Sequence, residues 1–169
     1  MNIITLLQPQ RIVFGDGCSP QCAEFLAQQG RKRVLLVTAA AILPFLDDLR
    51  SAFKKANLEV IIAPFFTAEP TISDFQRVCD FARSQHVDSV AGIGGGSVID
   101  IAKLVAALAD GKQSVTEVFG INLLKSRALP LVCLPTTAGT GAEVSPNAIL
   151  LDEGDELKKG VVSPHLVPD

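Results

Sequence analysis

The sequence has 169 residues, 48% of them hydrophobic, which is enough for one domain with a single well-packed core. Its 15 basic and 18 acidic residues give a formal net charge of -3, so no broad cationic surface is available for nucleic acid or an anionic membrane. The longest apolar stretch, 98–109, is interrupted by Asp100 and Lys103 and is shorter than the ~20 residues of a membrane span. These properties predict a soluble protein that binds neither nucleic acid nor membrane.

Cysteine usage and the N-terminal residues indicate the compartment. Met1 to Pro9 lack the charged and apolar layout of a signal peptide, so a reducing cytoplasm is predicted for the four cysteines. Cys18 and Cys22 have no second pair nearby, and both histidines stand alone in the sequence. We therefore favour small buried side chains over a zinc site, and no metal ligand is predicted.

The N-terminal third of the sequence predicts strands around one helix. Two short strands at 3–7 and 11–14 are separated by turn residues and predict a β-hairpin. Apolar positions at helical spacing predict a helix within 18–29, which Gly30 ends. A wholly apolar run then predicts a strand at 33–38 that is buried on both faces.

The rest of the sequence alternates helices with strands. The pattern predicts helices within 40–56, 73–85 and 97–108, strands at 59–63, 89–93 and 129–134, and a solvated turn at 152–159 between two late strands. Strands separated by helices cannot pair as hairpins, so the sheet should be mainly parallel, with right-handed crossovers. The fold class is therefore α/β, a Rossmann-like mainly parallel sheet with helices on both faces, and residues 1–169 form one domain.

The glycine loop, residues 94–97, lies between a predicted strand and a predicted helix. Three successive glycines let backbone N–H groups approach a ligand, and the helix N-terminus favours an anion such as a pyrophosphate. The stretch lacks the third glycine of the G-x-G-x-x-G fingerprint. Two alternatives are a tight turn and a capping box formed by Ser97 with Asp100.

The threonine loop, residues 136–145, follows another apolar strand. Small hydroxyl residues and two glycines could donate to a phosphate or ribose without blocking its approach, although threonines also occur in ordinary turns. Both loops follow strands of one parallel sheet, so they should converge on one crevice.

Together the Gly-Gly-Gly-Ser-x-x-Asp-x-x-Lys run at 94–103 and the Pro-Thr-Thr-Ala-Gly-Thr-Gly-Ala-Glu-Val-Ser run at 135–145 resemble the iron-containing alcohol dehydrogenases. The likeness extends over essentially the whole sequence. It implies the N-terminal domain that binds NAD or NADP, with the helical metal-binding domain absent from these 169 residues.

The resemblance also implies a set of cofactor-binding residues. Those implied near the pyrophosphate and nicotinamide are Gly95, Gly96, Ser97 and Asp100. Those implied near the adenine side and the phosphates are Thr136, Thr137 and Thr140. Those implied near the nicotinamide ribose and the mouth of the substrate cleft are Ser145, Asn147 and Lys158.

Three of the implied positions leave alternatives open. Ala39 stands where many family members carry an acid that rejects a 2′-phosphate, so the choice between NAD and NADP stays open. Glu69 stands where some members have asparagine, and it is either a ribose acceptor or an exposed loop acid. Lys158 adjoins Lys159, so an ordinary surface pair is the alternative to a ribose contact.

For the full-length protein the resemblance implies hydride transfer between an alcohol or aldehyde and nicotinamide, with a divalent metal, iron or zinc, as Lewis acid. In the family one aspartate and three histidines of the second domain bind that metal, and this sequence has two histidines, so the chain alone is expected to be inactive. Alternatives are a stand-alone nucleotide-binding module and a related polyol dehydrogenase or dehydroquinate-synthase-like enzyme. A homo-oligomer is expected.

Overall fold

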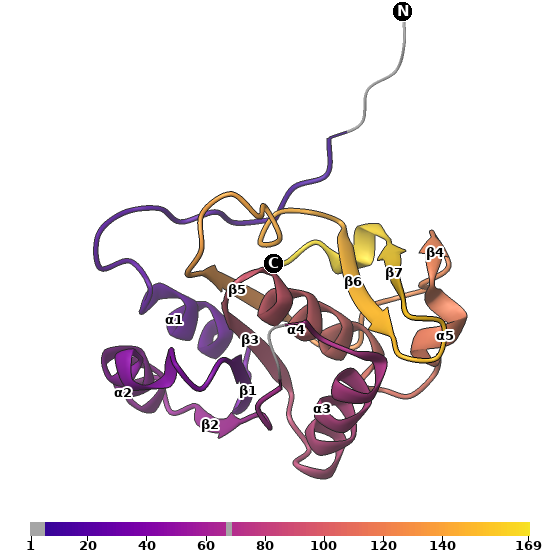
Figure 1. The fold of residues 1–169 in the computed structure, drawn as a ribbon. Helices are drawn as coiled ribbons and strands as arrows, with labels where there is room; N and C mark the ends of the chain where they lie inside the picture. Colours follow the sequence, from indigo (N-terminus) through magenta and orange to yellow (C-terminus); the bar gives the residue numbers. More distant parts are fainter. Residues whose placement is uncertain (1–5, 67–68) are drawn as a thin grey trace, which may run out of the picture.

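The computed structural model describes residues 6–66 and 69–169, and its centre is a four-stranded parallel sheet (Figure 1). Its order is β2-β1-β3-β5. The strands are β1 (Arg33–Thr38), β2 (Glu59–Ile62), β3 (Ser89–Gly94) and β5 (Leu131–Pro135). The strands predicted at 33–38, 59–63, 89–93 and 129–134 are therefore all present, and the prediction of a Rossmann-like α/β fold is confirmed.

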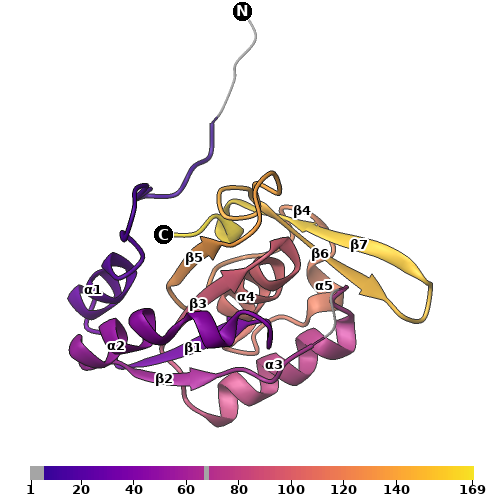
Figure 2. The same ribbon diagram turned by 60° about the vertical axis from the view of Figure 1, so that its left-hand side comes forward.

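Helices cover both faces of this sheet because its central strands are apolar on both sides. In β1, Val34 and Leu36 pack with α1 (Gln21–Gln28) and α2 (Asp47–Lys55), while Leu35 and Val37 pack with α3 (Ile72–Ser84) and α4 (Gly96–Leu108). A strand buried on both faces needs such a continuous apolar run. Figure 2 shows α1 and α2 on the side of the sheet opposite to α4.

α4 is buried almost all round because it lies between two sheets. Ten of its residues are buried, among them Ile99, Leu104 and Val105. Beyond it lies a three-stranded sheet of order β4-β7-β6, in which β6 (Asn147–Asp152) and β7 (Leu157–Val162) form an antiparallel hairpin. The predicted turn between two late strands is present but shorter, at 153–156 instead of 152–159, because β7 already begins at Leu157. The sheet that these strands join with β4 (Gly120–Ile121) was not predicted.

Two predicted boundaries need correction. The N-terminal hairpin is wrong where the structure describes it, because Arg11 donates its backbone N–H to the carbonyl of Asp169 and 11–14 is not a strand. Most of its other strand, Ile3 to Leu7, lies outside the described residues. The helix predicted within 40–56 is divided at Leu46 into a short 3₁₀ helix, η1 (Leu43–Phe45), and α2, and Pro44 lies in the first turn of η1, a position that proline tolerates.

Three further short elements complete the description. They are α5 (Val115–Val118), which begins in a Ser114–Glu117 capping box, β4, and the 3₁₀ helix η2 (Pro164–Leu166). Among the described residues no helix is long and apolar enough to cross a membrane.

Candidate nucleotide-binding site

The glycine loop and the threonine loop leave the same edge of the parallel sheet. β3 and β5 are neighbours, and Gly94 is paired with Pro135 at their carboxyl ends. The backbone N–H of Thr136 donates to the carbonyl of Gly94 at 3.0 Å, which joins the two loops at their start. The predicted convergence of the loops is present, because parallel neighbours end at one edge.

The glycines of this region divide into two groups by what surrounds them. A Cβ on Gly92 would lie 2.6 Å from the Cβ of Ala102, and one on Gly94 would lie 2.8 Å from the Cβ of Val98. Contacts under 3 Å essentially do not occur between such atoms. Gly92 and Gly94 therefore allow α4 to pack directly against β3.

Gly95 and Gly96 instead face the threonine loop. A Cβ on Gly95 would lie 3.4 Å from Oγ1 of Thr137, and one on Gly96 would lie 3.4 Å from the Cβ of Thr140. The missing side chains leave a narrow gap between glycine backbone and threonine side chains, at the N-terminus of a thirteen-residue helix. The N–H groups and partial positive charge of that end suit a phosphate, so a pyrophosphate fits these residues.

The alternative of a capping box at Ser97 is wrong. α4 begins at Gly96 with Gly95 as its N-cap, and no side chain caps the first turn. The carboxylate of Asp100 instead accepts the backbone N–H of Ile149 at 3.1 Å. The N-terminal N–H groups of α4 therefore have no side-chain cap competing with an anion.

Asp100 and Lys103 both hold strand β6, which lies at an edge of the three-stranded sheet. Asp100 accepts from Ile149, and Nζ of Lys103 donates to the carbonyl of Asn147 at 3.1 Å. Backbone N–H and C=O groups at the edge of a strand need hydrogen-bond partners when they are buried, and the side chains of Asp100 and Lys103 provide them here. The motif that opens α4 thus also holds β6 in place. The side chain of Ile149 in this strand is exposed, and the sequence had not indicated a role for it.

Burial raises the pKa of Asp100 from 3.8 to about 6, against the opposing effects of the Ile149 N–H and Lys103. A group with a raised folded-state pKa stabilises the fold fully below pH 3.8, and this contribution is lost as the pH rises through about 6. Relative to Asp100→Asn, the wild type should therefore lose roughly 1.5 kcal/mol of unfolding free energy between pH 5 and pH 8.

Urea unfolding of both proteins across this pH range measures the difference. Asp152→Asn is the matched control, because hydrogen bonds from Lys159 and the Gly154 backbone lower the pKa of Asp152. The stability that ionised Asp152 contributes is lost only as the pH falls through that lowered pKa. The difference in unfolding free energy between Asp152→Asn and the wild type should therefore stay constant from pH 5 to 8. If the difference in unfolding free energy between Asp100→Asn and the wild type also stayed constant over this pH range, the prediction would be contradicted.

Four further predicted residues occupy three places. Ser97 lies in the first turn of α4, and Ala39 follows β1 and packs partly against the core. Glu69 and Lys158 are both exposed and form an ion pair with 2.6 Å between Oε1 and Nζ. Lys159 pairs instead with Asp152 and Asp155.

Ser145 lies apart from the glycine loop. Its backbone and side-chain oxygens both accept from Lys103, seven positions along α4 from Gly96. Seven residues of helix extend about 10 Å, so Ser145 and Gly96 are separated by two turns. The structure therefore brings Gly95, Gly96, Thr137 and Thr140 together but places Ser145 against the body of α4.

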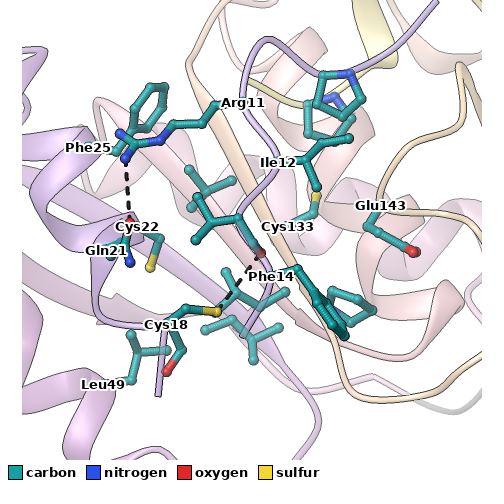
Figure 3. A pocket seen from close by; sticks show the side chains of 18 of the residues that line it. Arg11, Ile12, Phe14, Cys18, Gln21, Cys22, Phe25, Leu49, Cys133 and Glu143 are labelled. Atoms are coloured by element: carbon teal, nitrogen blue, oxygen red, sulfur yellow. Dashed lines mark hydrogen bonds between the residues drawn. The ribbon is translucent and has the colours of Figure 1, made fainter. Parts of the chain in front are cut away.

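A cavity of about 790 Å³ lies on the other side of β5 (Figure 3). The segment around Arg11 and Phe14, helix α1 and the edge strand β5 line it, and Cys18, Cys22 and Cys133 contribute thiols. Burial raises the pKa of Cys22 and of Cys133 to about 12, so both thiols are neutral. The cavity includes Thr136 but none of the glycine loop, and the sequence had not indicated it.

No group of three or more His, Cys, Asp or Glu side chains within 6–66 and 69–169 is placed to hold a metal ion. The described residues therefore do not fit a metal centre of their own.

Comparisons with known proteins agree with this geometry. The iron-containing alcohol dehydrogenase family matches residues 9–169. Alcohol dehydrogenase 4 of Schizosaccharomyces pombe is 28% identical over 170 residues, which cover 99% of this chain and 40% of that protein. The NAD-dependent methanol dehydrogenase of Bacillus methanolicus is 28% identical over 162 residues, which cover 95% of this chain and 42% of that protein.

A solved structure shows the same fold. The NADH-dependent butanol dehydrogenase A of Thermotoga maritima superposes with a TM-score of 0.89 at 28% identity, over 99% of this chain and 43% of that one. Fold and loops together define a Rossmann-like domain. The chain belongs to the iron-containing alcohol dehydrogenase family, and it spans about 40% of the length of the curated relatives it matches.

Proposed function

We propose that this chain is the NAD(P)-binding domain of a metal-dependent alcohol dehydrogenase that acts on a small alcohol or aldehyde. The observation that carries the proposal is the gap between Gly95 and Gly96 on one side and Thr137 and Thr140 on the other, at the uncapped N-terminus of α4. Backbone N–H groups, hydroxyls and a helix dipole in one place are what a pyrophosphate requires. When bound, the nicotinamide would accept or supply a hydride.

The cofactor type follows from the family and from Ala39. Two similar proteins are described as NAD- or NADH-dependent, which supports NAD. Ala39 has no carboxylate to repel a 2′-phosphate, so we expect NADPH to bind as well, within about tenfold of NADH. The other predicted contacts keep the roles that the family resemblance implies for them as part of this proposal, and they are Ser97, Asp100, Thr136, Ser145, Asn147, Lys158 and Glu69.

The proposal includes three properties of the whole protein. The metal, iron or zinc, would be held by residues other than those described, since these offer no ligand cluster. A homo-oligomer and a cytoplasmic location stay predictions from the sequence.

A titration with NADH and, separately, NADPH tests the proposal, with nicotinamide fluorescence as the signal. Gly95→Ala adds one carbon at ordinary contact distance from Thr137 and should keep affinity within a few-fold, whereas Gly95→Val fills the gap and should weaken binding at least tenfold, equivalent to about 1.4 kcal/mol. Thermal unfolding of each variant checks the fold. Saturable binding that Gly95→Val leaves unchanged, or no binding of either nucleotide, would contradict the proposal.

A further inference from the structure

Helix α4 carries a lysine that is completely buried. Lys103 has 0% exposure, although lysine is among the residues least often buried without a partner. Burial lowers the pKa of Lys103, while the nearby carboxylates of Asp100 and Glu143 act in the opposite direction. A buried ammonium of this kind requires hydrogen bonds to every proton.

Lys103 meets that requirement entirely with the end of the threonine loop and the strand that follows it. Nζ donates to the carbonyl of Ser145 at 2.7 Å, to its hydroxyl at 3.1 Å and to the carbonyl of Asn147 at 3.1 Å. An ammonium has three N–H groups, so the three acceptors match its full capacity.

These bonds form one of two anchors of the threonine loop. The other is at its start, where Thr136 donates to Gly94. Between the anchors, 136–140 is exposed, and Gly139 and Gly141 have positive φ angles of 93° and 63°. Val144 and Ser145 donate their N–H groups back to Gly141, so the return of the loop depends on where Lys103 holds Ser145.

We propose that Lys103 is a positioning residue that holds the return end of the threonine loop against α4 and thereby sets the gap in which a nucleotide diphosphate binds. This inference rests on the proposed function. Lys103 touches no part of that gap itself. It acts through Thr140, which faces Gly96 from the loop.

A double-mutant cycle separates positioning from general stabilisation. The chain is prepared as wild type, Lys103→Met, Thr140→Ala and the double variant, and each is titrated with NADH. We expect Thr140→Ala to weaken binding about fivefold in the wild type, as for the loss of one hydrogen bond, but less than twofold in the Lys103→Met protein. Lys103→Met alone should weaken binding about tenfold, and the exposed control Lys125→Met less than twofold.

Amide hydrogen exchange on the nucleotide-free chain gives a readout that does not depend on binding. In Lys103→Met, the N–H groups of Val144 and Ser145 should exchange at least tenfold faster, while those of β1 and β3 keep their order of protection. Ser145→Ala removes one acceptor and keeps both backbone bonds. Ser145→Ala should raise the exchange rate of the Val144 amide about threefold. This variant still tests the inference if Lys103→Met does not fold.

The outcomes distinguish this inference from the proposed function. Wild-type binding that Lys103→Met leaves unchanged overturns the inference alone. The inference alone is also overturned if Thr140→Ala weakens NADH binding equally in the wild type and in Lys103→Met. It is likewise overturned if amide exchange at Val144 is unchanged in both Lys103→Met and Ser145→Ala. If the wild type binds neither NADH nor NADPH, both the proposed function and the inference fail.

Discussion

Replacement of Gly92 by alanine is expected to lower the free energy of unfolding by about 1–3 kcal/mol, because a Cβ at this position would lie 2.6 Å from the Cβ of Ala102. Both atoms belong to rigid elements, β3 and α4, and the Cα of Ile99 is a further 3.7 Å neighbour. Relief of the contact requires α4 to move away from the sheet. Chemical denaturation measures the loss.

The matched control for this variant is Gly160→Ala in strand β7. Its added Cβ would have the carbonyl oxygen of Ala148 as nearest neighbour at 3.8 Å, an ordinary contact. Alanine should therefore change stability there by less than about 0.5 kcal/mol. Equal losses at Gly92 and Gly160 would mean that close packing of α4 on β3 is not what requires glycine at position 92.

Lys103→Met is expected to lower the free energy of unfolding by about 2–4 kcal/mol, since it leaves two backbone carbonyls, those of Ser145 and Asn147, without their donor. Methionine keeps the apolar stem and so limits the cavity. Domains of this size have about 5–15 kcal/mol of stability, so the variant should still fold.

Urea unfolding at pH 7 measures this loss, and Lys125→Met is its control because Lys125 is exposed. Substitution of an exposed lysine should change the unfolding free energy by less than about 0.5 kcal/mol. If Lys103→Met were as stable as this control, the hydrogen bonds of the buried ammonium would offset no more than the cost of burying it.

Both predictions concern α4, whose residues act at two ends of the candidate site. Gly92 and Gly94 let the helix lie directly on β3, so that its N-terminus opens between the two loops. Asp100 and Lys103 hold β6 and the return of the threonine loop on its other side. One helix therefore sets the geometry of the pyrophosphate gap, and a change in its packing should alter nucleotide affinity without touching the nucleotide.

The sequence by itself determined the parallel sheet and the meeting of the loops. Apolar runs such as Val34 to Val37 fit only strands buried on both faces, and helices between such strands require parallel pairing. The carboxyl ends of neighbouring parallel strands share an edge, so the convergence of 94–97 with 136–145 followed from local patterns alone.

Only the tertiary structure decided which polar groups become partners. Ser97 and Asp100 have the spacing of a capping box, but the carboxylate of Asp100 accepts the Ile149 N–H because the outer edge of β6 lies beside α4. In the sequence Lys103 is only the last residue of the 94–103 motif. In the structure its buried ammonium depends on Ser145, which lies 42 residues further along the chain. Spacing along the sequence defines local hydrogen bonds, whereas long-range ones depend on which elements pack together, and that is set by the whole core.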